Sequence, residues 1–401
     1  MKKILFVTDK NVLTTSGELR LIKNRAEILY SRYGIKTDFL AFQKKNRINS
    51  SAREMINAGG EMTVIPYSMK NPIKSVLGFV SLLKLVCNQV ENNEYDAIIF
   101  SGLGMSRFAK TVKRHFNIFT IIDMHGSQED IIETAKNASL RRKVFLRLLY
   151  AFEVDSLRRN FQYMDGCFAV TVALEKYIRK NYAVKDNIEF YHVPCATLNM
   201  CPVEDDYYIN RISYRDKYNI DKDEIVFIYS GGVSSWQCVG ETISLFRQIS
   251  KQIDCKTRLL IFSHNIDAIR KLLNDEDKNI ITDSYSAEEL QKALNAGDFA
   301  FMLRHDCVTN NVAFPNKFLE YIQSGMKIIA TPYVHDIASQ IKQYDVGYLY
   351  NFENDLTDII AYIQSEKSSK PDFEKRNTIL RYNSFDERLK KLASRLNDER
   401  V

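Results

Sequence analysis

Short apolar runs with the composition of β-strands alternate with longer amphipathic segments along most of the 401 residues. Six such runs stand in the first half of the chain, at residues 3–8, 36–42, 62–67, 95–102, 118–126 and 166–171. Five more stand in the second half, at residues 224–232, 258–263, 279–284, 298–304 and 327–331. Strands that alternate with helices predict an α/β fold with doubly wound parallel sheets.

A polar, tyrosine-bearing connector near residues 196–222 separates the two series of runs. A chain of this length is long for a single core, so two domains of about 200 residues each are expected. We therefore predict two tandem Rossmann-like domains, residues 1–200 and residues 201–380. In open sheets of this kind ligands bind at the carboxyl ends of the strands, so the residues that follow each strand form the candidate site, in a cleft between the domains.

Charge is divided unevenly between the two halves. Residues 1–200 carry 30 Lys and Arg against 19 Asp and Glu, or +11, whereas the remainder carries 26 against 31, or −5. A basic half favours a phosphate-bearing substrate, an anionic membrane surface or nucleic acid. Nucleic acid is the weakest of these, since no zinc-finger, basic-zipper or RNP-like signature is present. The seven cysteines show no CxxC pair, and they predict neither a metal site nor a disulfide framework.

Three strand ends carry residues suited to binding chemistry. Gly231 and Gly232 follow one strand and would let the backbone approach a phosphate closely. Arg304 ends another strand, and its guanidinium suits bidentate phosphate contact. In "DMHGSQED" a strand ends near His125, and Ser127 with the acid three residues later forms a capping-box pattern. The acids of that segment are equally well explained as first-turn residues that favour the helix dipole.

The stretch "FPNKFLEYIQSGMKIIATP", residues 314–332, predicts a short helix, a tight turn and a buried strand. At about 100° per residue its apolar side chains share one sector, while Lys317, Glu320 and Ser324 cluster opposite. Pro315 suits the first helical position and Gly325 the left-handed position past the end. The alternative is an amphipathic surface helix with an ordinary Lys–Glu pair.

This stretch resembles the donor-site motif of GT-B glycosyltransferases of the glycosyl transferases group 1 type. The resemblance implies that Glu320 binds the ribose hydroxyls of a nucleotide-sugar, a role that an ionised carboxylate with two acceptor oxygens can fill. It extends over most of the chain. "TTSGELR", with Gly17, is similar to the glycine loop after the first strand, "DMHG" to the acceptor-domain histidine, and "YSGG" to the phosphate loop. Residues 381–401 resemble the terminal helix that returns to the first domain.

Two departures from the family pattern concern charge. Val312 stands where many members have a second Glu, eight residues before Glu320. The loop "GGVSSWQCVG" lacks the Arg and Lys that members carry there. We expect Arg304 and Lys317 to supply the positive charge instead.

The resemblance implies transfer of a sugar from a nucleotide-sugar, UDP- or GDP-linked, to a hydroxyl of a saccharide acceptor that can be linked to a lipid diphosphate. It implies retention of configuration, no metal and no cofactor, and a place in bacterial surface-polysaccharide assembly such as capsule or lipopolysaccharide. His125 is the expected sugar or acceptor contact, and Arg304 is expected to stabilise the departing diphosphate. A nucleotide-sugar epimerase and a non-catalytic partner subunit are the alternatives.

Residues 139–160 combine apolar residues at helical spacing with six cations. Such a segment could lie against anionic lipid, or it could be an ordinary domain helix with a solvated face. The apolar run at the start of the chain is too short for a signal sequence. A cytoplasmic protein is therefore expected, and peripheral contact with the inner face of the membrane follows only if residues 139–160 lie against lipid.

Overall fold

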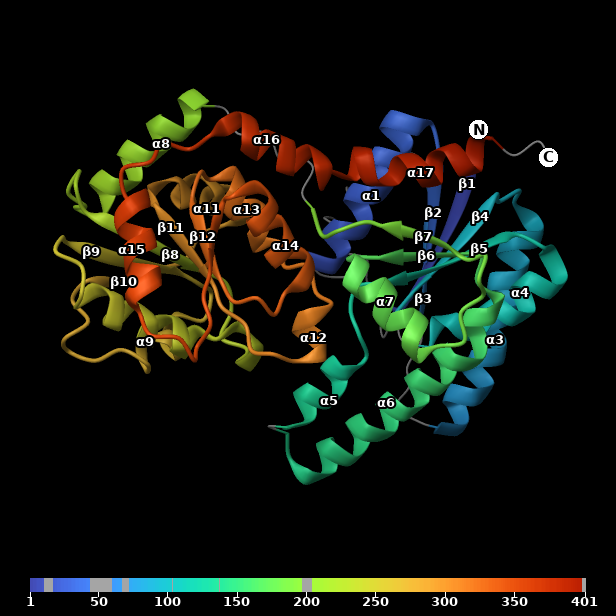
Figure 1. The fold of residues 1–401 in the computed structure, drawn as a ribbon. Helices are drawn as coiled ribbons and strands as arrows, with labels where there is room; N and C mark the ends of the chain where they lie inside the picture. The colour runs from blue at the N-terminus through green and yellow to red at the C-terminus, as the bar shows by residue number, and fades with distance from the viewer. Residues whose placement is uncertain are drawn as a thin grey trace. The chain divides into compact units, whose positions relative to one another are not determined.

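The computed structural model describes residues 1–10, 17–43, 60–66, 72–102, 104–136, 138–196 and 204–398. The chain divides into two compact units, one made of Met1–Leu198 with Ser384–Val401 and the other of Asn199–Asn383. Each unit holds a parallel sheet with helices packed on its faces (Figure 1). The α/β architecture with two Rossmann-like sheets is confirmed.

The first unit, called unit 1, has a seven-stranded sheet in the order β3-β2-β1-β4-β5-β6-β7. Its strands are β1 (Lys3–Thr8), β2 (Lys36–Gln43), β3 (Met62–Pro66), β4 (Ala97–Ser101), β5 (Phe119–Met124), β6 (Gly166–Ala169) and β7 (Glu189–His192). Its helices are α1 (Gly17–Tyr33), α3 (Pro72–Asn92), α4 (Ala109–Phe116), α5 (Glu129–Lys136), α6 (Leu140–Asn160), α7 (Val172–Asn181) and α17 (Phe385–Asn397).

The second unit, unit 2, has a six-stranded sheet in the order β10-β9-β8-β11-β12-β13. Its strands are β8 (Ile225–Ser230), β9 (Thr257–Phe262), β10 (Ile280–Asp283), β11 (Phe299–Met302), β12 (Lys327–Ala330) and β13 (Gly347–Leu349). Its helices are α8 (Glu204–Lys217), α9 (Val239–Ser250), α10 (Ile266–Arg270), α11 (Ala287–Ala293), α12 (Val308–Asn311), α13 (Lys317–Gln323), α14 (His335–Tyr344), α15 (Thr357–Glu366) and α16 (Phe373–Tyr382).

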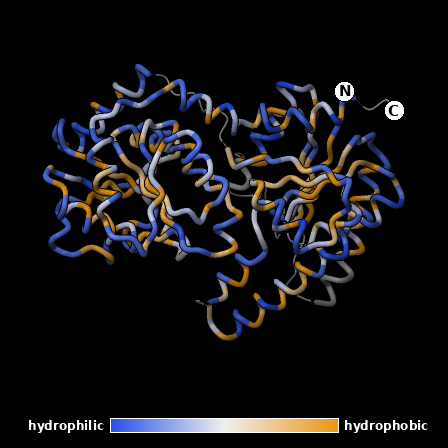
Figure 2. The backbone as a smooth tube through the Cα atoms, in the orientation of Figure 1, coloured by the Kyte–Doolittle hydropathy of each residue, from blue (hydrophilic) through white to orange (hydrophobic). Residues whose placement is uncertain are grey.

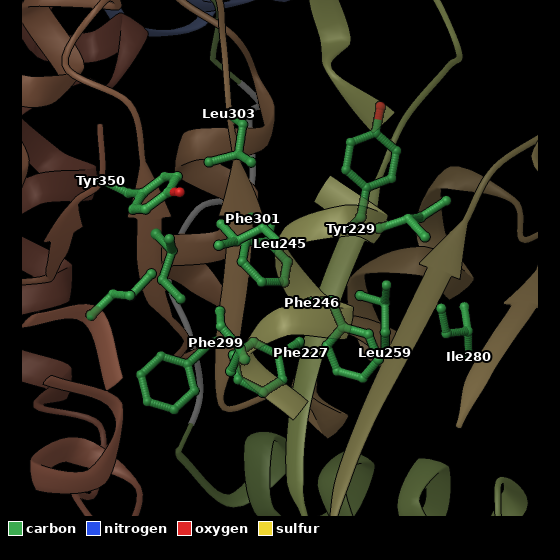
Figure 3. Close-up of a cluster of buried hydrophobic side chains, with 14 of the residues drawn as sticks. Phe227, Tyr229, Leu245, Phe246, Leu259, Ile280, Phe299, Phe301, Leu303 and Tyr350 are labelled. Carbon is green, nitrogen blue, oxygen red and sulfur yellow. The ribbon is translucent and has the colours of Figure 1, made fainter. Parts of the chain in front are cut away.

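Aromatic packing fixes the centre of the unit 2 sheet. The ring of Phe227 on β8 stacks on Phe299 and Phe301 of β11, with centroids 5.4 and 5.3 Å apart, and Phe246 of α9 packs edge-on against it (Figure 3). All four side chains are buried, and the central strands of both sheets lie in hydrophobic stretches of the chain (Figure 2). A close-packed core of this kind holds the carboxyl ends of β8 and β11 in fixed positions.

Both sheets reverse their strand order at one place. In unit 1 the chain runs outward on either side of the β1/β4 pair, and in unit 2 on either side of the β8/β11 pair. Such a reversal opens a crevice at the carboxyl ends of the two central strands, where ligands bind in open α/β sheets. The loops after these four strands are therefore the ones that can form sites.

The C-terminal helix α17 packs within unit 1 against α1 and β7. The hydroxyl of Tyr33 donates to the Asp386 carbonyl at 2.6 Å, and Arg395 donates to Glu189 at 3.0 Å. Leu389, one of the apolar residues of α17, is fully buried. The chain therefore returns to unit 1 with α17 after it has passed through all of unit 2. None of the helices in the described part of the chain is long and apolar enough to span a bilayer.

Candidate functional site

The loop after β8, residues 231–234, is called the glycine loop here, and it passes beside a buried lysine. Gly231 has φ of 137°, a conformation that side-chain-bearing residues rarely adopt, and a Cβ atom there would lie 2.9 Å from Lys317 Nζ. Lys317, the first residue of α13, donates to Gln237 Oε1 at 2.7 Å, and its ammonium group lies 4.5 Å from the centroid of the Tyr229 ring. At Gly232 an added Cβ atom would lie 3.6 Å from Asn265 and 3.9 Å from Gln237, which is ordinary van der Waals contact. Half-buried glycine backbone and a buried lysine therefore meet at the end of β8.

Arg304 follows β11 at the same edge of the unit 2 sheet. Thr331, just after β12, fixes the backbone of Arg304 through two hydrogen bonds. The Arg304 N–H donates to Thr331 Oγ1 at 2.9 Å, and the Thr331 hydroxyl donates to the Arg304 carbonyl at 2.8 Å. The guanidinium makes a 3.2 Å hydrogen bond to the Leu303 carbonyl. Arg304 is 4% exposed and Lys317 8% exposed, so both cations are largely removed from water.

Among the described residues neither cation forms an ion pair, although the charge of the Glu320 carboxylate partly opposes the fall in the pKa of Lys317. Within the described ranges, the ion pairs of unit 2 include neither Arg304 nor Lys317. Burial lowers the pKa of Arg304; burial, followed by repulsion from Arg304, lowers the pKa of Lys317 well below its ordinary value. Burying a charge without a partner is costly in free energy. The arrangement suits an anionic ligand that would supply the missing negative charge.

Helix α13 differs from its sequence prediction in two respects. It begins at Lys317 and not at Pro315, whose carbonyl instead accepts from the Phe318 N–H. Ser324 is not on an open polar face: it is fully buried and accepts from Gln291 Nε2 at 2.8 Å, a contact from another helix that periodicity cannot reveal. Gly325 adopts the predicted left-handed conformation, with φ of 81°. Glu320 is half-buried, three residues after Lys317 and therefore on the neighbouring turn of the helix.

A second group of side chains lies between the start of α9 and the end of β11. Three possible metal-ligand atoms lie within 4.8 Å of one another, one each from Cys238, Glu241 and His305. The distance from His305 Nε2 to Glu241 Oε1 is 2.8 Å. Thiolate, imidazole and carboxylate are ligands that divalent zinc accepts, so these residues could hold a metal ion. The sequence did not predict this group, because its members are separated along the chain.

In unit 1, His125 lies at the end of β5 and forms a dyad with Asp123. Its Nε2 is 2.8 Å from Asp123 Oδ2, and Arg25 of α1 donates to the other carboxylate oxygen at 2.8 Å. Ser101, the last residue of β4, donates to the same carboxylate at 3.1 Å. Burial alone would raise the pKa of Asp123, but His125 and Arg25 hold it well below the usual range. Asp123 therefore stays ionised and fixes the orientation of the His125 ring.

A buried acid that the sequence did not single out lies near the carboxyl end of β4. Glu153 of α6 is 3% exposed and accepts from the Gly104 N–H at 2.7 Å. Burial, opposed by that hydrogen bond and reinforced by Asp9, raises the pKa of Glu153 from 4.5 to about 7. This group therefore changes charge near neutral pH beside the β1/β4 crevice.

Two further sequence expectations concern helix starts in unit 1. The capping box at α5 is not formed: Ser127 Oγ is buried with no hydrogen-bond partner among the described residues, because the helix begins two residues later, at Glu129. Gly17 is the first residue of α1, in the segment that follows β1. Residues 14–16 of the segment "TTSGELR", predicted to resemble the loop after the first strand, lie outside the described residues.

Comparison with protein-family models and with curated protein sequences finds no match for this chain. Solved structures do match over its full length. A glycosyltransferase from Rickettsia africae aligns with a TM-score of 0.68 at 13% identity, covering 100% of this chain and 99% of its own. Sucrose-phosphate synthase from Thermosynechococcus elongatus aligns with a TM-score of 0.67 at 14% identity, covering 99% of each chain.

Anabaena HepE in complex with UDP aligns with a TM-score of 0.69 at 12% identity, covering 99% of this chain and all of its own. HepE has also been solved with UDP and glucose together. Identities this low establish the fold and leave the activity open. The protein is thus similar to GT-B glycosyltransferases along its whole length, and its two parallel sheets form the GT-B fold.

Proposed function

We propose that the protein is a glycosyltransferase that binds a nucleotide-sugar on unit 2 and transfers the sugar to a hydroxyl of a saccharide acceptor bound on unit 1. The observation that carries this proposal is the pair of buried cations, Arg304 and Lys317, of which Lys317 lies beside Gly231 of the glycine loop and neither forms an ion pair with a described residue. A nucleoside diphosphate supplies two negatively charged phosphates to such a site. Similarity to solved structures with UDP bound supports the same ligand class.

The residues divide into three roles. Backbone N–H groups of the glycine loop, with Gly231 and Gly232, would bind the diphosphate, and the two cations would stabilise the charge that develops on it as the glycosidic bond breaks. Glu320 would accept hydrogen bonds from the ribose hydroxyls. His125, oriented by Asp123, would contact the sugar or the acceptor hydroxyl, and Gly17 begins α1, the helix whose Arg25 binds Asp123.

We further propose retention of anomeric configuration and a role in assembly of a surface polysaccharide, with a UDP- or GDP-linked sugar as the donor. These three proposals extend the sequence resemblance to the retaining glycosyltransferases of the group 1 type.

The test is release of nucleoside diphosphate from UDP- and GDP-sugars, measured with and without saccharide acceptors. We expect release that an acceptor accelerates, together with a glycosylated product whose anomeric configuration nuclear magnetic resonance can assign. Conversion of the donor sugar to a stereoisomer without any acceptor would instead establish the epimerase alternative. Absence of turnover and of nucleotide binding would establish the partner-subunit alternative.

A further inference from the structure

The first half of α6 exposes an unusual concentration of large apolar side chains. Sixteen large hydrophobic residues are exposed in the described part of the chain, and five of them lie within thirteen residues of this one helix. Their exposed fractions are 78% for Leu140, 52% for Val144, 62% for Phe145, 66% for Leu148 and 37% for Phe152. Exposed apolar patches on a globular protein mark surfaces that contact a partner or a membrane.

These side chains share one side of the helix. Leu140, Val144, Leu148 and Phe152 follow one another at intervals of four residues, which places them on successive turns, and Phe145 lies beside this line. In unit 1, α5 and the first half of α6 extend beyond the edge of the sheet, and hydrophobic and hydrophilic residues alternate along this part of α6 (Figures 1 and 2). We call the five exposed residues the apolar line of α6.

Within the first half of α6 itself, the charges that flank the apolar line are all positive, whereas acids lie on the packed helix α5. Arg141, Arg142 and Arg147 are exposed and Lys143 is half-buried, and no Asp or Glu occurs between residues 139 and 152. Each cation next to an anionic bilayer adds to the electrostatic attraction, which weakens as the salt concentration rises. A helix with apolar residues on one side and arginines flanking them is the pattern of helices that lie in the membrane interface.

Self-association through the same surface is disfavoured by this charge. In a two-fold symmetric dimer each patch meets its own copy, so four cations would face four cations. The guanidinium of Arg107 lies 3.4 Å from the centroid of the Phe152 ring, which fixes this end of the line against η1 (Met105–Phe108). The apolar line is therefore held by the body of unit 1 at one end and open at the other.

We propose that the first half of α6 docks unit 1 onto an anionic lipid surface, with the apolar line inserted among the lipids and the flanking arginines on the headgroups. The docking is independent of the donor site. It bears on the proposed function in one respect: an acceptor linked to a lipid diphosphate would lie in the same surface.

The test is flotation with phosphatidylcholine vesicles, with and without about one-third phosphatidylglycerol, at low and high salt. We expect wild-type protein to float with anionic vesicles only, and less at high salt. The double variant Phe145→Glu/Leu148→Glu should bind at least about tenfold more weakly, since it replaces two inserted side chains with charges. Arg141→Glu/Arg142→Glu should lose binding to a similar degree.

Two controls match these variants. Ile209→Glu/Ile212→Glu alters another exposed apolar pair, on α8, whose first turn is acidic, and should leave vesicle binding unchanged. Lys176→Glu/Lys180→Glu makes the same change in charge on α7 and should cost much less binding than the arginine pair. Equal loss with either control, or no vesicle binding by the wild type, overturns the proposal. A dimer that the Phe145 and Leu148 changes dissociate, without any vesicle binding, overturns it as well.

A direct measurement complements flotation. The chain has one tryptophan, Trp236, in unit 2, so the variant Phe145→Trp in a Trp236→Phe background carries a single reporter on the apolar line. Its emission should move to shorter wavelength with anionic vesicles, because the indole enters an apolar environment. Unchanged emission on vesicles that bind the protein would place the contact elsewhere and contradict the proposal.

Discussion

Replacing Lys317 with methionine should weaken nucleotide binding strongly and at the same time stabilise the ligand-free protein. Hydrogen bonds to charged groups contribute about 1.5–3 kcal/mol, so loss of this cation should weaken nucleoside-diphosphate affinity roughly 10- to 100-fold. The same ammonium is buried within electrostatic reach of Arg304 and forms no ion pair with a described residue, so removing it should raise the melting temperature of the free protein. Opposite changes in stability and affinity are typical of a residue kept for ligand binding.

Uptake of a proton by Lys317 when nucleotide binds provides a second measurement of the effect of Lys317→Met. Because burial lowers the pKa of Lys317 in the free protein, its neutral form becomes populated at a lower pH than that of an ordinary lysine. A bound diphosphate favours the charged form, so binding above about pH 8, where phosphates are fully ionised, should take up protons. Calorimetry in buffers of different ionisation enthalpy measures this uptake, which should disappear in Lys317→Met.

The control is Lys342→Met, which removes an exposed lysine from α14 of the same unit. It should change neither affinity nor proton uptake. If Lys317→Met binds nucleotide as the wild type does, or if it is less stable than the wild type without ligand, then Lys317 is structural and the role given to it here is wrong.

Replacing Glu153 with glutamine should alter the pH dependence of stability. Its pKa is raised in the folded protein from 4.5 to about 7, so the folded state retains a proton that the unfolded chain loses first. Folding stability from this group is therefore highest below pH 4.5 and falls as the pH rises towards 7. The shift corresponds to about 3 kcal/mol.

The variant Glu153→Gln keeps an acceptor for the Gly104 N–H and has no charge to bury. Relative to this variant, the wild type should lose up to about 3 kcal/mol of unfolding free energy between about pH 4.5 and 7.5. Denaturant unfolding at a series of pH values measures the difference, with Glu94→Gln as the control for loss of an exposed carboxylate. A difference that is flat with pH, or that runs the other way, would show that Glu153 is not held protonated.

The central strands of both sheets were predictable, because their burial on two faces demands continuous apolar runs. The two strands that sequence patterns missed, β7 and β13, are the outermost strands of their sheets. They have only four and three residues, and their pairing with a neighbour, rather than their composition, makes them strands.

In the site, too, features of the local sequence could be predicted, but contacts between distant segments could not. Gly231, Arg304 and His125 could be predicted because each follows a strand, and the carboxyl edge of a parallel sheet is where such residues converge. Arg25, which holds Asp123, lies 98 residues away along the chain, and no local pattern connects the two. The placing of Ser324 was wrong for a related reason: periodicity gives the side of a helix, but not what packs against it.

The central claim is that unit 2 binds a nucleoside diphosphate. Its most direct test is the melting temperature of the purified protein titrated with UDP, GDP, CMP and ADP, for the wild type, for Glu320→Ala and for the control Glu374→Ala, which changes an exposed acid on α16. A ligand at 100 times its dissociation constant stabilises by about 2.7 kcal/mol, which is readily detected. The account predicts that UDP or GDP stabilises the wild type and the control but not Glu320→Ala. Stabilisation by no nucleotide, or equal stabilisation of all three proteins, would contradict it.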